Sequence, residues 1–226
     1  MIRAIVFIFS FSLFAADNEV SIDQLGGTLN LDIEQLGSGN LIGGQSATAG
    51  SMTPLDLDGN TMTIDINQIG DSNLFKGDIT SDSFTGFFEF DGDSNIFDIQ
   101  VDPTNTYGAD TSNLNIDVTG NSNDMSLDQA TTAMATTLDL DWIIQGNSNT
   151  IDVDIDVDLA TNYMDIDGDS NTINYNGDGY QGGYFYLDHE GDSRTINVTQ
   201  ASTLDNDWLR VFSNGDNGTF CIIQND

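Results

Sequence analysis

The side chains best suited to chemistry in this 226-residue chain are one histidine, one cysteine and 37 acidic residues. His189 and Cys221 could form a thiol nucleophile with its base, but the alternation of apolar and polar residues points them to opposite faces. No nucleophile elbow, phosphate-binding loop or zinc-protease motif is present. Paired carboxylates could cleave a glycosidic bond, but among 37 acids some pair is inevitable. We expect no enzyme, and a glycan-degrading β-solenoid is the third interpretation of the function.

A four-residue turn recurs eight times and is the strongest pattern in the chain. The first glycines of successive copies are 22 to 33 residues apart. A period in the twenties indicates a stacked repeat architecture. The copies are Gly37-Ser-Gly-Asn40, Gly70-Asp-Ser-Asn73, Gly92-Asp-Ser-Asn95, Gly120-Asn-Ser-Asn123, Gly146-Asn-Ser-Asn149, Gly168-Asp-Ser-Asn171, Gly191-Asp-Ser-Arg194 and Gly215-Asp-Asn-Gly218.

Apolar and polar residues alternate on both sides of each turn, as in Leu29-Leu31-Ile33 before a turn and Ile151-Val153-Ile155 after one. This period predicts strands with one buried face. We expect an all-β fold, a two-sheet β-solenoid of about eight strand-turn-strand coils with variable loops on one edge. The loops are predicted at 41–54, 77–86, 102–112, 126–137, 158–162, 176–184 and 199–207. Asp58-Gly59-Asn60 reads as an additional tight turn of the hairpin type.

Polar residues of the turns share the parity of the apolar residues beside them and should therefore point inward. Gln35 and Gln68 precede their turns in this parity. The asparagines that follow the turns do the same: Asn40, Asn73, Asn95, Asn123, Asn149 and Asn171. Stacked amide side chains hydrogen-bond from coil to coil, so a ladder is predicted. Gly and Asn also supply the unusual backbone angles of a tight turn.

Two turns read Q-x-G-x-x-N, namely Gln35-Leu-Gly37-Ser-Gly-Asn40 and Gln68-Ile-Gly70-Asp-Ser-Asn73. This motif resembles the curlin repeat of curli-type bacterial amyloid subunits. The resemblance implies an amide-lined β-solenoid that polymerises into an extracellular fibre of a biofilm matrix. The chain departs from the pattern at the Gln position, where the other turns carry Phe90, Val118, Ile144, Ile166, His189 and Ser213. At the Asn position, Arg194 and Gly218 depart.

The first residues have the layout of a secretory signal peptide. Arg3 precedes the apolar run Ala4–Phe14, and Ala15 and Ala16 follow it. The apolar run is too short to span a bilayer. We expect a signal peptide at 1–16, a single β-solenoid repeat domain at 17–226 and a secreted protein, extracellular or at the cell surface. Cys221 has no cysteine partner in the chain, so it is either a small outward residue or an intermolecular thiol.

The formal net charge of −33 limits the partners. Nucleic-acid binding needs a basic face, and anionic lipid repels an acidic one. Outward rows such as Asp152, Asp154 and Asp156 would repel one another between coils unless salt or bound cations screened them. Ca²⁺ takes carboxylate oxygens, but no EF-hand loop is present. We expect either a salt-adapted surface without a cofactor or specific Ca²⁺ binding.

The end of the chain has no evident cap, because its last strand reads Phe220-Cys-Ile222-Ile-Gln224 with no proline or lysine. Open strand edges pair with other chains. The leading hypothesis is therefore an exported structural subunit that forms a homopolymer by end-to-end β-stacking. The alternative is a monomeric Ca²⁺-dependent adhesin that binds a cell surface or glycan. Two aromatic clusters are expected in the core or in stacks between coils, Phe84-Phe87-Phe88-Phe90 and Tyr180-Tyr184-Phe185-Tyr186.

Overall fold

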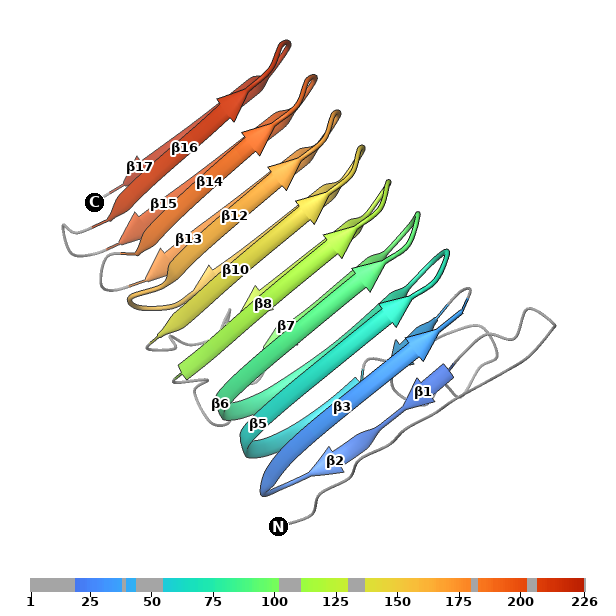
Figure 1. Ribbon diagram of the computed structural model, residues 1–226. Helices are drawn as coiled ribbons and strands as arrows, with labels where there is room; N and C mark the ends of the chain where they lie inside the picture. Colours follow the sequence, from blue (N-terminus) through green and yellow to red (C-terminus); the bar gives the residue numbers. More distant parts are fainter. Residues whose placement is uncertain are drawn as a thin grey trace.

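The computed structural model describes residues 19–37, 40–43, 55–101, 111–129, 137–179, 183–202 and 207–225. The signal peptide expected at 1–16 lies outside these residues. Within them the chain is all-β without helix, and it forms a parallel β-solenoid of about seven turns, close to the eight coils expected. Figure 1 shows the coils stacked side by side, with the tight turns along one edge.

The coils have two faces. The strands that enter the turns form the first face: β3 (Thr28–Leu36), β5 (Leu55–Ile69), β6 (Leu74–Asp91), β8 (Thr111–Thr119), β10 (Leu138–Gln145), β12 (Thr161–Asp167), β14 (Tyr184–Glu190) and β16 (Trp208–Asn214). The first parts of β5 and β6 lie in the second face with the remaining strands: β1 (Glu19–Ser21), β2 (Asp23–Leu25), β4 (Leu41–Gly43), β7 (Ile96–Val101), β9 (Asp124–Gln129), β11 (Thr150–Asp156), β13 (Thr172–Gly179), β15 (Thr195–Ser202) and β17 (Thr219–Asn225). Every ladder between coils is parallel, for example β10 with β12 and β15 with β17.

Two sequence predictions at the loop edge were wrong. The predicted loop 77–86 lies inside β6, and the predicted tight turn Asp58-Gly59-Asn60 lies inside β5, which pairs in parallel with β6. Both strands bend from the second face to the first without a break. At each bend two consecutive residues stay outside the core, Asn60 with Thr61 and Asp82 with Ser83. This shifts the alternation by one residue, which in the sequence resembles a turn.

The other predicted loops are shorter than expected. Strands β4, β9, β13 and β15 run on into the predicted ranges, and β8, β12 and β14 begin within them. Positions of these loops such as 102–110, 130–136 and 203–206 lie outside the described residues.

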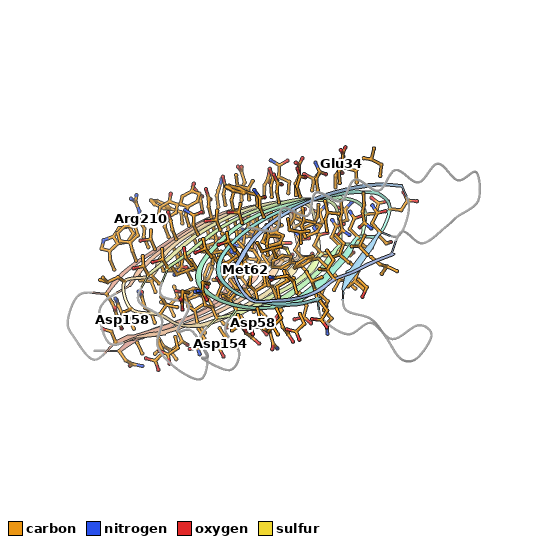
Figure 2. The ribbon with its side chains drawn as sticks, turned by 90° about the horizontal axis from the view of Figure 1, so that it is seen from below. Glu34, Asp58, Met62, Asp154, Asp158 and Arg210 are labelled. Atoms are coloured by element: carbon orange, nitrogen blue, oxygen red, sulfur yellow. The ribbon has the colours of Figure 1, made fainter. Side chains whose placement is uncertain are left out.

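The core lies between the two faces and follows the alternation of the strands. In β10, Leu138, Leu140, Trp142 and Ile144 are fully buried. Figure 2 looks along the stack and shows a flattened oval, with Met62 inside and Asp154 and Arg210 projecting outward. Each fully buried large apolar side chain stabilises the fold by about 1.5 to 3 kcal/mol relative to exposure.

The aromatic clusters divide between core and surface. Phe84, Phe88 and Phe90 are buried, and the Phe88 ring lies 5.1 Å from that of Phe75. Phe87 is 45% exposed on the outer face. In the second cluster Phe185 is buried, whereas Tyr184 is exposed and Tyr186 half-buried. Tyr180 lies outside the described residues.

Candidate functional site

The turn glycines are required by the close approach of successive coils. Gly120, Gly146, Gly168 and Gly191 have φ between 144° and 149°, which side chains rarely adopt. A Cβ at Gly146 would overlap the carbonyl oxygen of Gly120 in the preceding coil. The same overlap occurs where φ is not left-handed, as at Gly70 over Gly37 and Gly92 over Gly70. Only glycine therefore lets these turns stack.

The inner ladder consists of the asparagines that follow the turns. All six are buried, with at most 1% exposed surface. Their side-chain bonds run from Nδ2 to the next Oδ1: Asn40 to Asn73 at 3.1 Å, Asn73 to Asn95 at 2.9 Å, Asn95 to Asn123 at 3.0 Å and Asn123 to Asn149 at 2.9 Å. The Asn149 backbone N–H then donates to Asn171 Oδ1 at 3.0 Å.

In the described part of the chain, the column of inward glutamines beside the inner ladder contains only two residues. Gln35 and Gln68 are buried, and Gln68 Nε2 donates to Gln35 Oε1 at 2.7 Å. In the following coils Phe90 and then aliphatic side chains occupy this column. A polar group returns at His189, whose Nε2 lies 3.2 Å from Asn171 Nδ2. The column therefore carries amides at the first end, an apolar middle and a polar group near the last end.

A second ladder, which the sequence analysis missed, runs along the outside of the turns. This outer ladder consists of Asn121, Asn147, Asp169, Asp192 and Asp216. The side-chain oxygens of the first four accept a backbone N–H of the next coil: Asn121 from Asn147 at 3.1 Å, Asn147 from Asp169 and Asp169 from Asp192 both at 2.6 Å, and Asp192 from Asp216. The signal was Asp or Asn directly after the first glycine in seven consecutive turns, of which the last five form the ladder. The outer ladder satisfies turn N–H groups that face no strand partner.

The inner ladder ends in a buried cation. Arg194 takes the asparagine position with only 5% of its surface exposed, and its Nη1 donates to the carbonyl oxygens of Gly191 and Asp216 at 2.9 and 3.2 Å. Its guanidinium lies 5.3 Å from the centre of the Phe220 ring. One coil later Gly218 leaves no side chain at this position. The amide ladder thus stops before the last coil.

The last coil exposes apolar residues that lie in the inward register. Phe220 and Ile222 occupy the inward register of β17, yet each is 45% exposed. Their neighbours in β15, Ile196 and Val198, are at most 1% exposed. Alternation predicted that Phe220 and Ile222 point inward, and they occupy that register, but no coil of the described residues follows to cover them. Cys221 lies between them as an exposed free thiol.

Aromatic side chains stack along the outer surface of the last coils. The Tyr163 and Tyr186 rings are 4.9 Å apart and nearly parallel, and the Tyr184 and Trp208 rings are 4.0 Å apart. Arg210 lies 4.1 Å from the centre of the Phe212 ring. These stacks end at Trp208 and Phe212 of β16, the last strand of the first face.

The acidic side chains form outward rows. Burial and then the Asp154 and Asp98 carboxylates raise the pKa of Asp128, and burial and then the Asp178 carboxylate raise the pKa of Asp156. In the part of the chain that the structure describes, Lys76 with Asp98 is the one ion pair, at 2.8 Å. No three His, Cys, Asp or Glu side chains of the described residues are placed to share a metal ion.

The candidate catalytic groups stay apart. His189 lies in the core side of β14 and Cys221 on the outer side of β17. Burial, and then the Arg194 charge, lower the pKa of His189. Near the loop edge, Tyr175, Gln200 and Asp207 line a cavity of about 10 Å³, which is too small for an organic substrate. Among the described residues there is no helix long and apolar enough to cross a membrane.

Searches with family models, against curated proteins and against solved structures gave no match to this chain.

Proposed function

We propose that the chain is an exported structural subunit that assembles end to end into an extracellular fibre or matrix. The supporting observation is the last coil. Phe220 and Ile222 are each 45% exposed there, and among the described residues β16 pairs only with β14 and β17 only with β15. Open parallel strand edges beside exposed apolar residues are a template for another chain.

The outer faces favour assembly at the ends over assembly at the sides. Rows of aspartates cover the second face, as in Asp152 and Asp154 of β11, and the net charge is −33. Two such faces repel each other at low salt, whereas the ends add strand pairs and apolar contacts. The expected product is an unbranched filament one solenoid wide.

The test uses the full-length chain at tens of micromolar, imaged by negative-stain electron microscopy and followed by sedimentation velocity over a range of salt concentrations. Filaments are expected. A Phe220→Asp/Ile222→Asp variant should stay monomeric, because it adds two charges to the open end. Leu159→Asp/Tyr163→Asp is the matched control, since it also adds two charges at residues that are 53% and 40% exposed but lie in the middle of the stack.

Circular dichroism of both variants controls for folding. The proposal fails if the wild-type chain remains monomeric at every salt and Ca²⁺ concentration. It also fails if the Phe220→Asp/Ile222→Asp variant assembles as readily as the Leu159→Asp/Tyr163→Asp control.

A monomeric Ca²⁺-dependent adhesin for a cell surface or glycan is the second candidate. The observation that favours it is the crowding of Asp128, Asp154 and Asp156 on the second face, where burial and neighbouring carboxylates raise the pKa of Asp128 and Asp156. A divalent cation would relieve that repulsion. Isothermal titration calorimetry with Ca²⁺ tests it, together with the melting temperature with and without the ion. Absence of both heat and a melting shift would rule this candidate out.

A further inference from the structure

The two ends of the solenoid differ in burial and in charge. Inward residues of the first coil are covered, with Leu31 1% and Ile33 2% exposed, unlike Phe220 and Ile222 of the last coil. Of the three cations in the described residues, Arg194 and Arg210 lie in the last two coils. The third, Lys76, is paired with Asp98.

The first coil is acidic. Its exposed outward side chains include Asp23, Asp32 and Glu34, and it contains no lysine or arginine. The last coil is less acidic, because Arg210 lies there with only Asp207 and Asp216 among the described residues 207–225. A joint between the last coil and an acidic first coil is therefore repelled less than a joint between two first coils, and Arg210 can attract an acid of the first coil.

The turns fix how a second copy fits on the last coil. Each turn glycine stacks on the carbonyl of the preceding turn glycine, so a continued stack places Gly37 of the second copy on Gly215. Counting back from these glycines brings residues of β3 in the second copy beside residues of β16: Leu31 beside Leu209, Asp32 beside Arg210, Ile33 beside Val211, and Gln35 beside Ser213. Apolar residues then meet apolar residues, and Asp32 meets the cation of the last coil.

In this alignment, each of these residues of β3 meets a residue of β16 that lacks a matching neighbour on its open side among the described residues of its own copy. Leu209 and Val211 are only partly buried at the end of the core. The Ser213 hydroxyl is buried without a hydrogen-bond partner, next to the position where the Gln35 amide would stand. Arg210 makes its ring contacts with Phe212 and Tyr186, and no described carboxylate lies within ion-pair distance of it.

The same alignment creates a conflict on the second face. There β17 would lie beside β4 of the second copy, with Phe220 beside Ile42 and Cys221 beside Gly43. That edge of β4 is already paired with β1, where Ser21 lies beside Gly43. One of the two strands has to leave.

We infer that the joint is a head-to-tail strand exchange, in which β17 of one copy displaces residues 19–25 of the next copy. This inference rests on the proposed end-to-end assembly. The displaced segment forms two strands of three residues, whereas β17 is one continuous strand of seven. Phe220 and Ile222 also replace the smaller pair Val20 and Ile22. The exchange lets both faces continue, because β16 meets β3 while β17 meets β4.

Charge reversal tests the alignment on the first face. Arg210→Asp alone and Asp32→Arg alone should each raise the critical concentration for assembly on the order of tenfold, since each replaces an attraction by a repulsion. The double variant should return it to the wild-type value. Asp139→Arg is the control for Asp32→Arg, because Asp139 is exposed on β10 in the middle of the stack.

Disulfide cross-linking tests the exchange on the second face. Neighbouring parallel strands lie about 4.8 Å apart, within the span of a disulfide. In oxidised assemblies, Gly43→Cys should cross-link to the native Cys221 of another copy, whereas Ser21→Cys should not. If Ser21→Cys cross-links to Cys221 instead, the ends abut without exchange and the inference is overturned.

The outcomes separate this inference from the function on which it rests. If the wild-type chain does not assemble, both fall. If it assembles but the double charge variant is no better than the single ones, only the strand exchange in this alignment falls. Should Gly43→Cys fail to fold, the charge-reversal set still decides the alignment, because Asp32 and Arg210 are exposed outward residues.

Discussion

Asn123 lies in the middle of the inner ladder and offers the sharpest test of what the ladder contributes. Its side chain donates to Gly120 O at 2.8 Å and to Asn149 Oδ1 at 2.9 Å, and it accepts from the backbone and side-chain nitrogens of Asn95 at 3.2 and 3.0 Å. Asn123→Ala removes all four bonds. At about 1 kcal/mol net for each of the four, the loss in the free energy of unfolding is about 4 kcal/mol.

The matched control is Asn121→Ala in the outer ladder, two residues away. The Asn121 side chain accepts two bonds from Asn147, at 3.1 and 3.4 Å, but it is exposed and water replaces them. The expected loss is about 0.5 kcal/mol. The difference between the two variants isolates the effect of burial, because the same amide is removed from the same turn.

The assay is equilibrium urea unfolding, followed by far-ultraviolet circular dichroism and by tryptophan fluorescence in a Trp208→Phe background, which leaves Trp142, fully buried in the next coil, as the reporter. Amide hydrogen exchange adds a local readout, since a repeat protein can open coil by coil. Faster exchange is expected around residues 95 and 149 in Asn123→Ala. Equal losses in the two variants would refute the view that the buried amides hold the coils together.

Three further predictions concern the turns and the titrating groups. Gly146→Ala should destabilise the chain by more than about 3 kcal/mol, because its Cβ overlaps Gly120 O and the backbone is also strained. Gly26→Ala is the control: Gly26 has a φ of 81° and open space around it, so only the strain of about 1 kcal/mol is expected. Equal losses of stability in the two variants would contradict the overlap. The pKa of the Asp128 carboxyl is raised above its ordinary 3.8, so the folded chain binds the carboxyl proton more tightly than the unfolded chain does. Stability should therefore rise as the pH falls from neutral toward 3.8. Thermal unfolding of Asp128→Asn should show a higher midpoint than the wild type at pH 7 and a smaller gain on acidification. The pKa of His189 is lowered from 6.5, so the folded chain binds the imidazole proton less tightly and stability is lost as the pH falls below 6.5. His189→Gln should remove that loss. An unchanged pH profile of stability in this variant would show that His189 does not take up a proton on unfolding.

The stack and the direction of its side chains could be predicted from the sequence, because alternation and turn spacing are local signals. The inward position of Asn40 follows from parity alone, and the structure places it in the core. The continuous strands β5 and β6 could not be predicted, because their bends at Asn60 and Asp82 place two outward residues in succession. Such a shift in parity has the same local pattern as a loop.

The open end was expected from the absence of a cap, but its extent could not be predicted. Alternation gives Phe220 the same inward direction as Ile196, and only the stack of described coils shows how much of Phe220 is exposed. The outer ladder was missed because Asp and Gly are common in any exposed turn, so an aspartate after glycine gives no sign of a ladder. Its role depends on the backbone N–H of a residue some 22 to 26 positions away.

The distribution of charge and of open edges gives the proposed assembly its direction. A surface with a net charge of −33 resists contact at every face where aspartates line up, so attraction has to come from places where strand edges and apolar residues outweigh repulsion. The last coil is such a place, with Phe220 and Ile222 exposed on β17 and Arg210 on β16. Salt weakens the repulsion between faces far more than it weakens strand pairing. The same filaments should therefore stay single at low salt and associate side by side as salt rises, while their growth continues to depend on the last coil.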